Sequence, residues 1–188
     1  MGVIDSIEMT DEQLLQGCIR NDASAQKGLY DKFSRKMFGV CLRYASNREE
    51  AEDLLQEGFV KVFQNLSSFN SEGSFEGWIR RIMVNTALDF IRRQKLVWSD
   101  QEIEDDQLSG DDTMEKLGVN ELLKLINALP PGFRTVFNLY AIEGYQHKEI
   151  GQLLGISENT SKSQFARART QLAKQIQEMN QKTNTIHS

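Results

Sequence analysis

Residues 161–169 concentrate side chains that hydrogen-bond to DNA bases and phosphates. Lysine and arginine bind guanine edges or phosphate oxygens, glutamine pairs with adenine, and serine reaches phosphate oxygens. The cluster therefore predicts a nucleic-acid contact made by one face of a helix. The candidate residues are Ser161, Lys162, Ser163, Gln164, Arg167 and Arg169.

The segment 146–171 supplies two short helices that would hold this cluster. Gly155 can adopt the positive φ of a tight turn between them, and Ser157 is a suitable N-cap for the second helix. This arrangement is typical of a DNA-binding helix-turn-helix, whose second helix lies in the major groove. An ordinary αα-hairpin with a solvated basic face is the alternative. The inward face of the second helix would carry Phe165, Ala168 and Leu172.

A second basic surface is expected on a long helix over residues 75–95. Arginines beside an asparagine and a nearby loop phenylalanine suit a nucleic-acid strand with exposed bases. Phe69 could equally pack its loop on the core, and Asn85 could be an ordinary exposed helix residue. We interpret Trp78 as a core residue. The candidates on and beside this helix are Phe69, Arg80, Arg81, Asn85, Arg92 and Arg93.

A polar stripe follows the preceding helix, which begins after its predicted N-cap, Asn47. Asp53, Gln56, Glu57 and Lys61 recur at helical spacing on the side opposite its apolar residues. Spacing alone favours a solvated surface for this stripe.

Composition narrows the class of protein. The 188 residues carry a net charge of −5, so the chain as a whole does not coat nucleic acid. Cys18 and Cys41 lie on apolar helix faces, which predicts buried thiols rather than a disulfide or metal site. The sequence lacks a recognisable signal peptide, membrane-length apolar run, P-loop or nucleophile with a base. We therefore expect a cytoplasmic protein that is not an enzyme and needs no metal, cofactor or small-molecule substrate.

The fold expected from these patterns is all-α, because the chain has two prolines and little alternation of apolar and polar residues. Two small helical domains, residues 9–95 and 113–178, would be joined by an acidic, flexible linker over 96–112. Thr10 and Gln13 predict a capping box at the first helix. His147 is interpreted as a helix-surface residue, and the polar tail from about Glu178 is expected to be disordered.

Three segments in this order, residues 47–63, 75–95 and 129–169, resemble an ECF-type (group IV) sigma factor of the sigma-70 family of bacterial RNA polymerase. The resemblance covers roughly residues 9–176. It implies a sigma region 2 helical bundle at 9–95 and a sigma region 4 helix-turn-helix at 113–178. It also implies a linker that threads toward the polymerase active-site cleft.

The resemblance also implies roles for the candidate residues. Asp53, Gln56 and Glu57 would bind the polymerase clamp helices, which reverses the solvated interpretation of that stripe. The loop of Phe69 together with Asn85 would capture a flipped base of the minus-ten element. The DNA backbone there would be held by Arg80, Arg81, Arg92 and Arg93. The minus-thirty-five element would be read by the cluster within 161–169.

The implied partners are core RNA polymerase, through its clamp helices and flap, promoter DNA and an anti-sigma factor. The free chain would be a monomer. Gln164 and Ala166 stand where many family members have an arginine and a larger residue, so the base preference stays open. Two alternatives remain at this point: a dimeric helix-turn-helix regulator that does not join polymerase, and an enzyme with a DNA-binding appendage.

Overall fold

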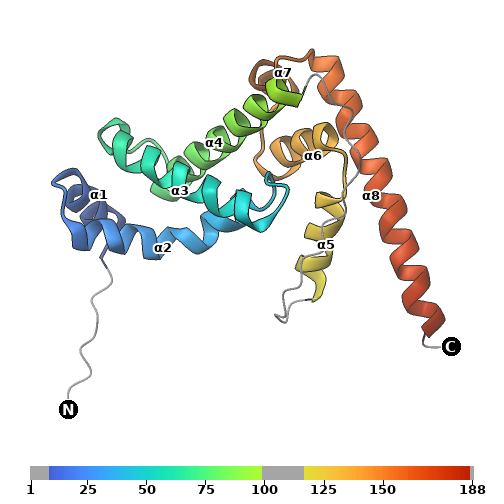
Figure 1. The fold of residues 1–188 in the computed structure, drawn as a ribbon, viewed down its shortest axis with the longest axis horizontal. Helices are drawn as coiled ribbons and strands as arrows, with labels where there is room; N and C mark the ends of the chain where they lie inside the picture. Colours follow the sequence, from blue (N-terminus) through green and yellow to red (C-terminus); the bar gives the residue numbers. More distant parts are fainter. Residues whose placement is uncertain (1–8, 99–116, 187–188) are drawn as a thin grey trace. The chain divides into compact units, whose positions relative to one another are not determined.

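The computed structural model describes residues 9–98 and 117–186 of the chain. All the regular elements in these residues are helical, which confirms the all-α class (Figure 1). The chain divides into two compact units, Met1–Glu102 and Ile103–Ser188. The division falls within the segment predicted as the linker, most of which lies outside the described residues. The flexibility of that linker and the limits of the two domains therefore stay predictions.

Within residues 9–98, the first unit contains the helices that Figure 1 labels α1 to α4 and one short 3-10 helix. Helix α2 packs against each of the other three α-helices, and α3 and α4 also pack side by side. This places α2 at the centre of the bundle. The elements are α1 (Asp11–Ile19), α2 (Ala23–Cys41), α3 (Arg48–Asn65), η1 (Leu66–Ser68) and α4 (Phe75–Trp98).

Side-chain caps fix where the first helices begin. The Thr10 hydroxyl accepts a hydrogen bond from the Gln13 amide at 3.2 Å, and the Gln13 side chain accepts one from the Thr10 amide at 2.9 Å. This confirms the predicted capping box. The predicted cap of α3 is also confirmed, because Asn47 Oδ1 accepts from the Glu50 amide at 2.8 Å.

Apolar residues from all four helices form the core of the first unit. Both cysteine thiols are buried in it, as predicted, and burial raises the pKa of Cys41 to about 12. Ile19, which ends α1, is 44% exposed. The most deeply buried large side chains are Leu14, Leu29, Met37, Leu54, Val62, Ile79, Met83, Val84 and Leu88.

The second unit is organised around α8, which packs against α5, α6 and α7. Its core is built from residues on α5, α8 and the turn before α6, with aromatic and aliphatic side chains from α6 and η2 packed beside it. The elements are α5 (Leu117–Asn127), α6 (Pro131–Phe137), the π-helical turn η2 (Asn138–Ile142), α7 (His147–Leu154) and α8 (Glu158–Ile186). The core residues are Ile126, Leu129, Ala168 and Leu172.

Two helices extend further than expected. Helix α4 continues to Trp98, three residues beyond the predicted end of the first domain. Helix α8 continues to Ile186, so the disorder predicted from about Glu178 is wrong for residues 178–186. Both extensions lack glycine and proline, the residues that most strongly end a helix. Polarity alone was therefore a poor signal for the end of α8.

Candidate nucleic-acid interface

A tight turn joins α7 to α8 in the second unit. Gly155 has φ 66°, the left-handed conformation that glycine adopts at little cost. The amide of Ile156 donates to the carbonyl of Gly151 at 3.0 Å, which closes the end of α7. Ser157 Oγ accepts from the Thr160 amide at 2.9 Å and caps α8. The turn glycine and the N-cap predicted from the sequence are both confirmed.

Gly151 is a structural requirement of this motif that the sequence reasoning missed. A Cβ at this position would lie 2.8 Å from the carbonyl oxygen of Ile156 and 3.5 Å from the amide nitrogen of Glu158. A side chain there would therefore push α7 away from the turn and from the start of α8. The available signal was a glycine inside an apolar helical pattern, next to the buried Ile150.

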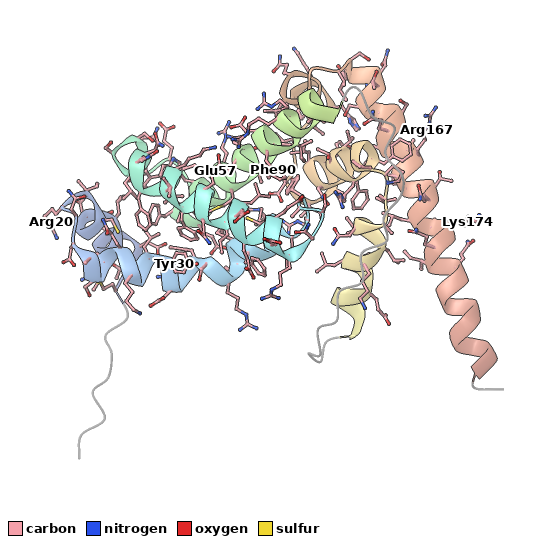
Figure 2. All side chains as sticks on the ribbon, in the orientation of Figure 1. Arg20, Tyr30, Glu57, Phe90, Arg167 and Lys174 are labelled. Atoms are coloured by element: carbon pink, nitrogen blue, oxygen red, sulfur yellow. The ribbon has the colours of Figure 1, made fainter. Side chains whose placement is uncertain are left out.

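The solvent face of α8 carries most of the predicted DNA-binding residues. Lys162, Ser163, Arg167 and Arg169 are all exposed. Arg167, labelled on α8 in Figure 2, makes no hydrogen bond or ion pair with the other described residues. Lys162 pairs with Glu158 at 2.6 Å. This hydrogen bond lowers the pKa of the Glu158 carboxyl below its ordinary value. The face is basic and open to solvent, as a contact with phosphates and bases requires.

Gln164 is less accessible than its neighbours on α8. It is half-buried, and its Oε1 would lie 3.5 Å from a Cβ placed on Gly132 in the first turn of α6. The amide therefore rests beside α6, at the edge of the exposed face. The structure keeps Gln164 near the basic cluster without turning it fully to solvent.

Ser161 does not lie on the exposed face, so the prediction that placed it there is wrong. It is 0% exposed, and its Oγ lies 2.9 Å from Nδ1 of His147. His147, which we interpreted as a helix-surface residue, is half-buried, and its ring stacks on Tyr140 with 4.2 Å between centroids. Residues 161, 165, 168 and 172 recur every three or four positions and share one helix face. That spacing was the signal for the burial of Ser161.

In the first unit, Phe69 is held in an aromatic cluster at the start of α4. Its ring centroid lies 5.1 Å from that of Phe75 and 5.6 Å from that of Trp78. Phe69 and Trp78 are half-buried. Trp78, which we interpreted as a core residue, stacks on the buried Phe75 with 5.8 Å between centroids. Ser74 Oγ accepts from the Gly77 amide at 3.0 Å and supports the end of the loop. These contacts favour the packing alternative for Phe69 while leaving part of its ring accessible.

The polar residues of α4 divide among different faces of the helix. Arg81, Asn85 and Arg92 are exposed and lie within roughly 40° of one another around the helix axis. Arg80 is half-buried and lies on another side of α4, and Arg93 points toward α3. The structure therefore brings together three of the predicted DNA-binding residues and separates the other two from them.

Charged side chains link α3 to α4. Glu57 accepts from Lys61 at 3.0 Å and from Arg93 at 3.1 Å. Asp89 pairs with Arg92 at 2.6 Å and lies 3.6 Å from the Lys61 ammonium. Partial burial raises the pKa of Glu57, but the hydrogen bonds from Lys61 and Arg93 outweigh it and lower that pKa below its ordinary value.

The polar stripe on α3 contains an apolar residue that the sequence reasoning missed. Asp53 and Gln56 are exposed and Glu57 is half-buried. Val60 lies among them at helical spacing and is 53% exposed. An exposed apolar residue ringed by polar ones is a common arrangement in protein–protein contacts. The signal was its spacing of three, four and seven residues from the stripe.

Two family models match this chain. The model for sigma-70 region 2 matches residues 29–97, and the model for sigma-70 region 4 matches residues 119–172. The ECF RNA polymerase sigma factor SigE of Mycolicibacterium smegmatis is 34% identical over 145 residues, which are 73% of this chain and 56% of that protein. The corresponding factor SigW of Bacillus subtilis is 29% identical over 92% of this chain and 100% of that protein. The chain belongs to the ECF sigma factors.

The fold of this ECF sigma factor also occurs in a solved structure. The sigma factor RpoE of Bartonella quintana, in complex with the anti-sigma factor NepR, has a TM-score of 0.57 and 20% sequence identity. The match covers 80% of this chain and 96% of that one. Within the described residues no cluster of metal-ligating side chains was found. No helix in the same ranges has both the length and the apolarity to cross a membrane.

Proposed function

We propose that this sigma factor binds core RNA polymerase and directs it to promoters that carry a minus-thirty-five and a minus-ten element. The proposal rests on two surfaces that occur together in this chain. One is the exposed basic face of α8, which is the second helix of a helix-turn-helix, and the other is the accessible polar stripe of α3. The protein would act by binding and by opening DNA, without covalent chemistry. Its partners would place it in the cytoplasm.

The minus-thirty-five element would be contacted by the exposed face of α8. Lys162, Ser163, Arg167 and Arg169 reach solvent there, and Gln164 stands at the edge. Arginine is the best suited to a bidentate contact with a guanine edge, and the shorter polar residues suit phosphates. Ser161 is left out of this contact set because its hydroxyl is buried.

The minus-ten element would be opened on α4. Arg81 and Arg92 flank Asn85 on one exposed face, so the arginines would hold the backbone of one strand while the amide pairs with a base. Extruding a base costs a few kcal/mol, which stacking and hydrogen bonds in a pocket must offset. The accessible part of Phe69 would form a wall of that pocket. Arg80 and Arg93 would act less directly, from the sides of α4.

The contact with polymerase would lie on α3. Asp53, Gln56 and Glu57 supply polar groups, and Val60 supplies apolar surface among them. In protein interfaces an apolar anchor surrounded by polar groups that exclude water contributes much of the affinity. This arrangement favours a protein partner over solvent as the neighbour of the stripe.

A titration of labelled sigma factor with core RNA polymerase tests the proposal. Glu57→Lys reverses a charge within the stripe, and we expect it to weaken binding by at least about tenfold. Glu12→Lys is the control, because Glu12 is exposed and lies on α1, outside the stripe. Equal affinities of the two variants would contradict the assigned surface. No binding by the parent chain would contradict the function and favour the dimeric regulator.

We further propose that the free chain is a monomer and that an anti-sigma factor controls it. The solved structure of a related fold, RpoE, contains the anti-sigma factor NepR. Size-exclusion chromatography with and without core polymerase checks the oligomeric state. A stable dimer that fails to bind polymerase would favour the alternative regulator.

A further inference from the structure

The geometry points to the hydrogen bond between His147 and Ser161 as the contact that positions α8 for binding to promoter DNA. We infer that Ser161 supports recognition of the minus-thirty-five element from beneath the helix, as a positioning residue that never touches DNA. The inference rests on the proposed function of the second unit, and it replaces the direct DNA contact expected of Ser161 from the sequence.

The bond joins the two helices of the helix-turn-helix. His147 is the first residue of α7, and Ser161 lies in the first turn of α8, 14 positions later. Ser161 is 0% exposed, and its Oγ lies 2.9 Å from Nδ1 of the imidazole. Leaving a buried hydroxyl without its partner costs free energy of folding. The bond therefore favours the separation of the two helices at which it can form.

Neighbouring rings fix the orientation of the imidazole. The ring of Tyr140 stacks on it with 4.2 Å between centroids and 9° between planes. Phe165 of α8 lies 5.7 Å away on a tilted face and also packs on Tyr140 at 4.5 Å. The imidazole is therefore held by η2 and by α8, and its Nδ1 is directed at Ser161.

The hydroxyl of Ser161 bonds to another helix rather than to the backbone of its own helix. A serine inside a helix commonly bonds back to the carbonyl four residues earlier. Within the described residues, Ser161 Oγ instead bonds to a side chain of the preceding helix. The exposed Ser163, two positions later, bonds back to the carbonyl of Thr160 at 3.0 Å. Ser161 therefore bonds between the two helices, whereas Ser163 bonds within α8.

The location of the pair explains why it would affect DNA binding. Lys162 and Ser163 follow Ser161 directly, and Arg167 lies on the same helix. In a helix-turn-helix the N-terminal part of the second helix contacts base edges. Binding groups must be held within a fraction of an ångström by residues behind them. Loss of the bond between His147 and Ser161 would therefore displace the DNA contacts of Lys162, Ser163 and Arg167 together.

A double-mutant cycle tests the inference. Promoter affinity is measured with the holoenzyme, on a duplex selected from a random library by the parent holoenzyme. We expect Ser161→Ala and His147→Leu each to weaken binding about fivefold, and the double variant to be no weaker than either. Ser163→Ala is the matched control. Its effect should be the same in the parent and in the His147→Leu background, because Ser163 does not bond to His147.

Two further readouts separate positioning from general loss of stability. His147→Asn places an amide near the position of Nδ1, so it should recover binding to within about twofold of the parent, unlike His147→Leu. Single base-pair substitutions in the minus-thirty-five element should reduce affinity by the same factors in Ser161→Ala as in the parent. A residue that reads a base would instead lose discrimination at one position.

Several outcomes would overturn the inference. These are additive effects of Ser161→Ala and His147→Leu, failure of His147→Asn to recover binding, or relaxed specificity at one base pair in Ser161→Ala. If circular dichroism shows that Ser161→Ala does not fold, the comparison of His147→Leu with His147→Asn decides alone. A parent chain that forms no promoter-binding holoenzyme would overturn the proposed function itself, which is a distinct result.

Discussion

Arg93 donates from Nη2 to both carboxylate oxygens of Glu57, at 3.1 Å to each. The contact joins α4 to α3 across 36 positions of sequence. It ties a residue of the proposed polymerase surface to a residue at the edge of the proposed minus-ten surface. A change at Glu57 is therefore expected to affect the packing of α3 on α4 as well as the contact with polymerase.

The pH dependence of stability should report the Glu57 contacts. The pKa of Glu57 is lowered in the folded protein, so its carboxylate contributes stability above its unfolded-state pKa of about 4.3. That contribution is lost as pH falls through the lower, folded-state pKa. Because the side chain is 38% exposed, we expect Glu57→Gln to cost at most about 1 kcal/mol at pH 7. Urea unfolding of parent and variant across this range measures the difference.

The control for this measurement is Glu52→Gln, which removes a carboxylate that pairs with Arg48 within α3. Its effect should be smaller at neutral pH than that of Glu57→Gln. A Glu57→Gln difference that persists unchanged below the folded-state pKa would show that ionisation of Glu57 is not its source.

Arg167→Ala should weaken binding to the minus-thirty-five element by about 1–3 kcal/mol and relax discrimination at one base pair, if Arg167 makes a bidentate base contact. Lys174→Ala removes the same charge two turns further along α8 (Figure 2). We expect the lysine variant to affect all sequences alike, through phosphate attraction alone. Titration of holoenzyme against single base-pair variants distinguishes the two. Equal discrimination by Arg167→Ala and the parent would remove Arg167 from the base contacts.

Asn85→Ala should reduce open-complex formation more than closed-complex binding, because the amide would pair with a base only after that base leaves the duplex. Permanganate reactivity of melted thymines measures opening, and a gel shift measures binding. Gln16→Ala, at an exposed amide in α1, serves as the control. Parent-like thymine reactivity in Asn85→Ala would argue against its role in strand opening.

Gly151→Ala should destabilise the second unit by roughly 1–3 kcal/mol, as overpacking does in other well-packed sites. The added Cβ would lie 2.8 Å from the carbonyl of Ile156, and backbone atoms cannot move aside cheaply. Gly39→Ala is the opposite case, because a Cβ there meets nothing within 4 Å inside α2. That variant should be stabilised by about 0.5–1 kcal/mol. Thermal unfolding of both variants checks the signs, and a stable Gly151→Ala would show that the turn can relax.

Local signals made much of the fold predictable from the sequence. The capping box of Thr10 and Gln13, the cap at Asn47 and the positive φ of Gly155 each depend on a few adjacent residues. Such interactions are encoded within one turn of a helix, so the residue type and its spacing suffice. The buried face of α3 followed from apolar residues at helical spacing in the same way.

The interactions that tertiary packing creates were not predictable. Nothing near Glu57 in the sequence indicates Arg93 as its partner, and that partner depends on how α3 packs on α4. Ser161 was assigned to the solvent face because it is polar, although its spacing from Ala168 placed it on the buried face. Most buried polar side chains have a hydrogen-bond partner, and the partner of Ser161, His147, lies on another helix.

Transcription from a promoter template tests the central claim most directly. Core RNA polymerase, freed of its own sigma factors, is supplied with the chain and a template selected from a random library by the reconstituted holoenzyme. We predict a discrete transcript that requires the chain and disappears when either promoter element is altered. Identical transcription by the core enzyme with and without the chain, while the chain still binds DNA, would contradict the assignment of promoter-directed initiation.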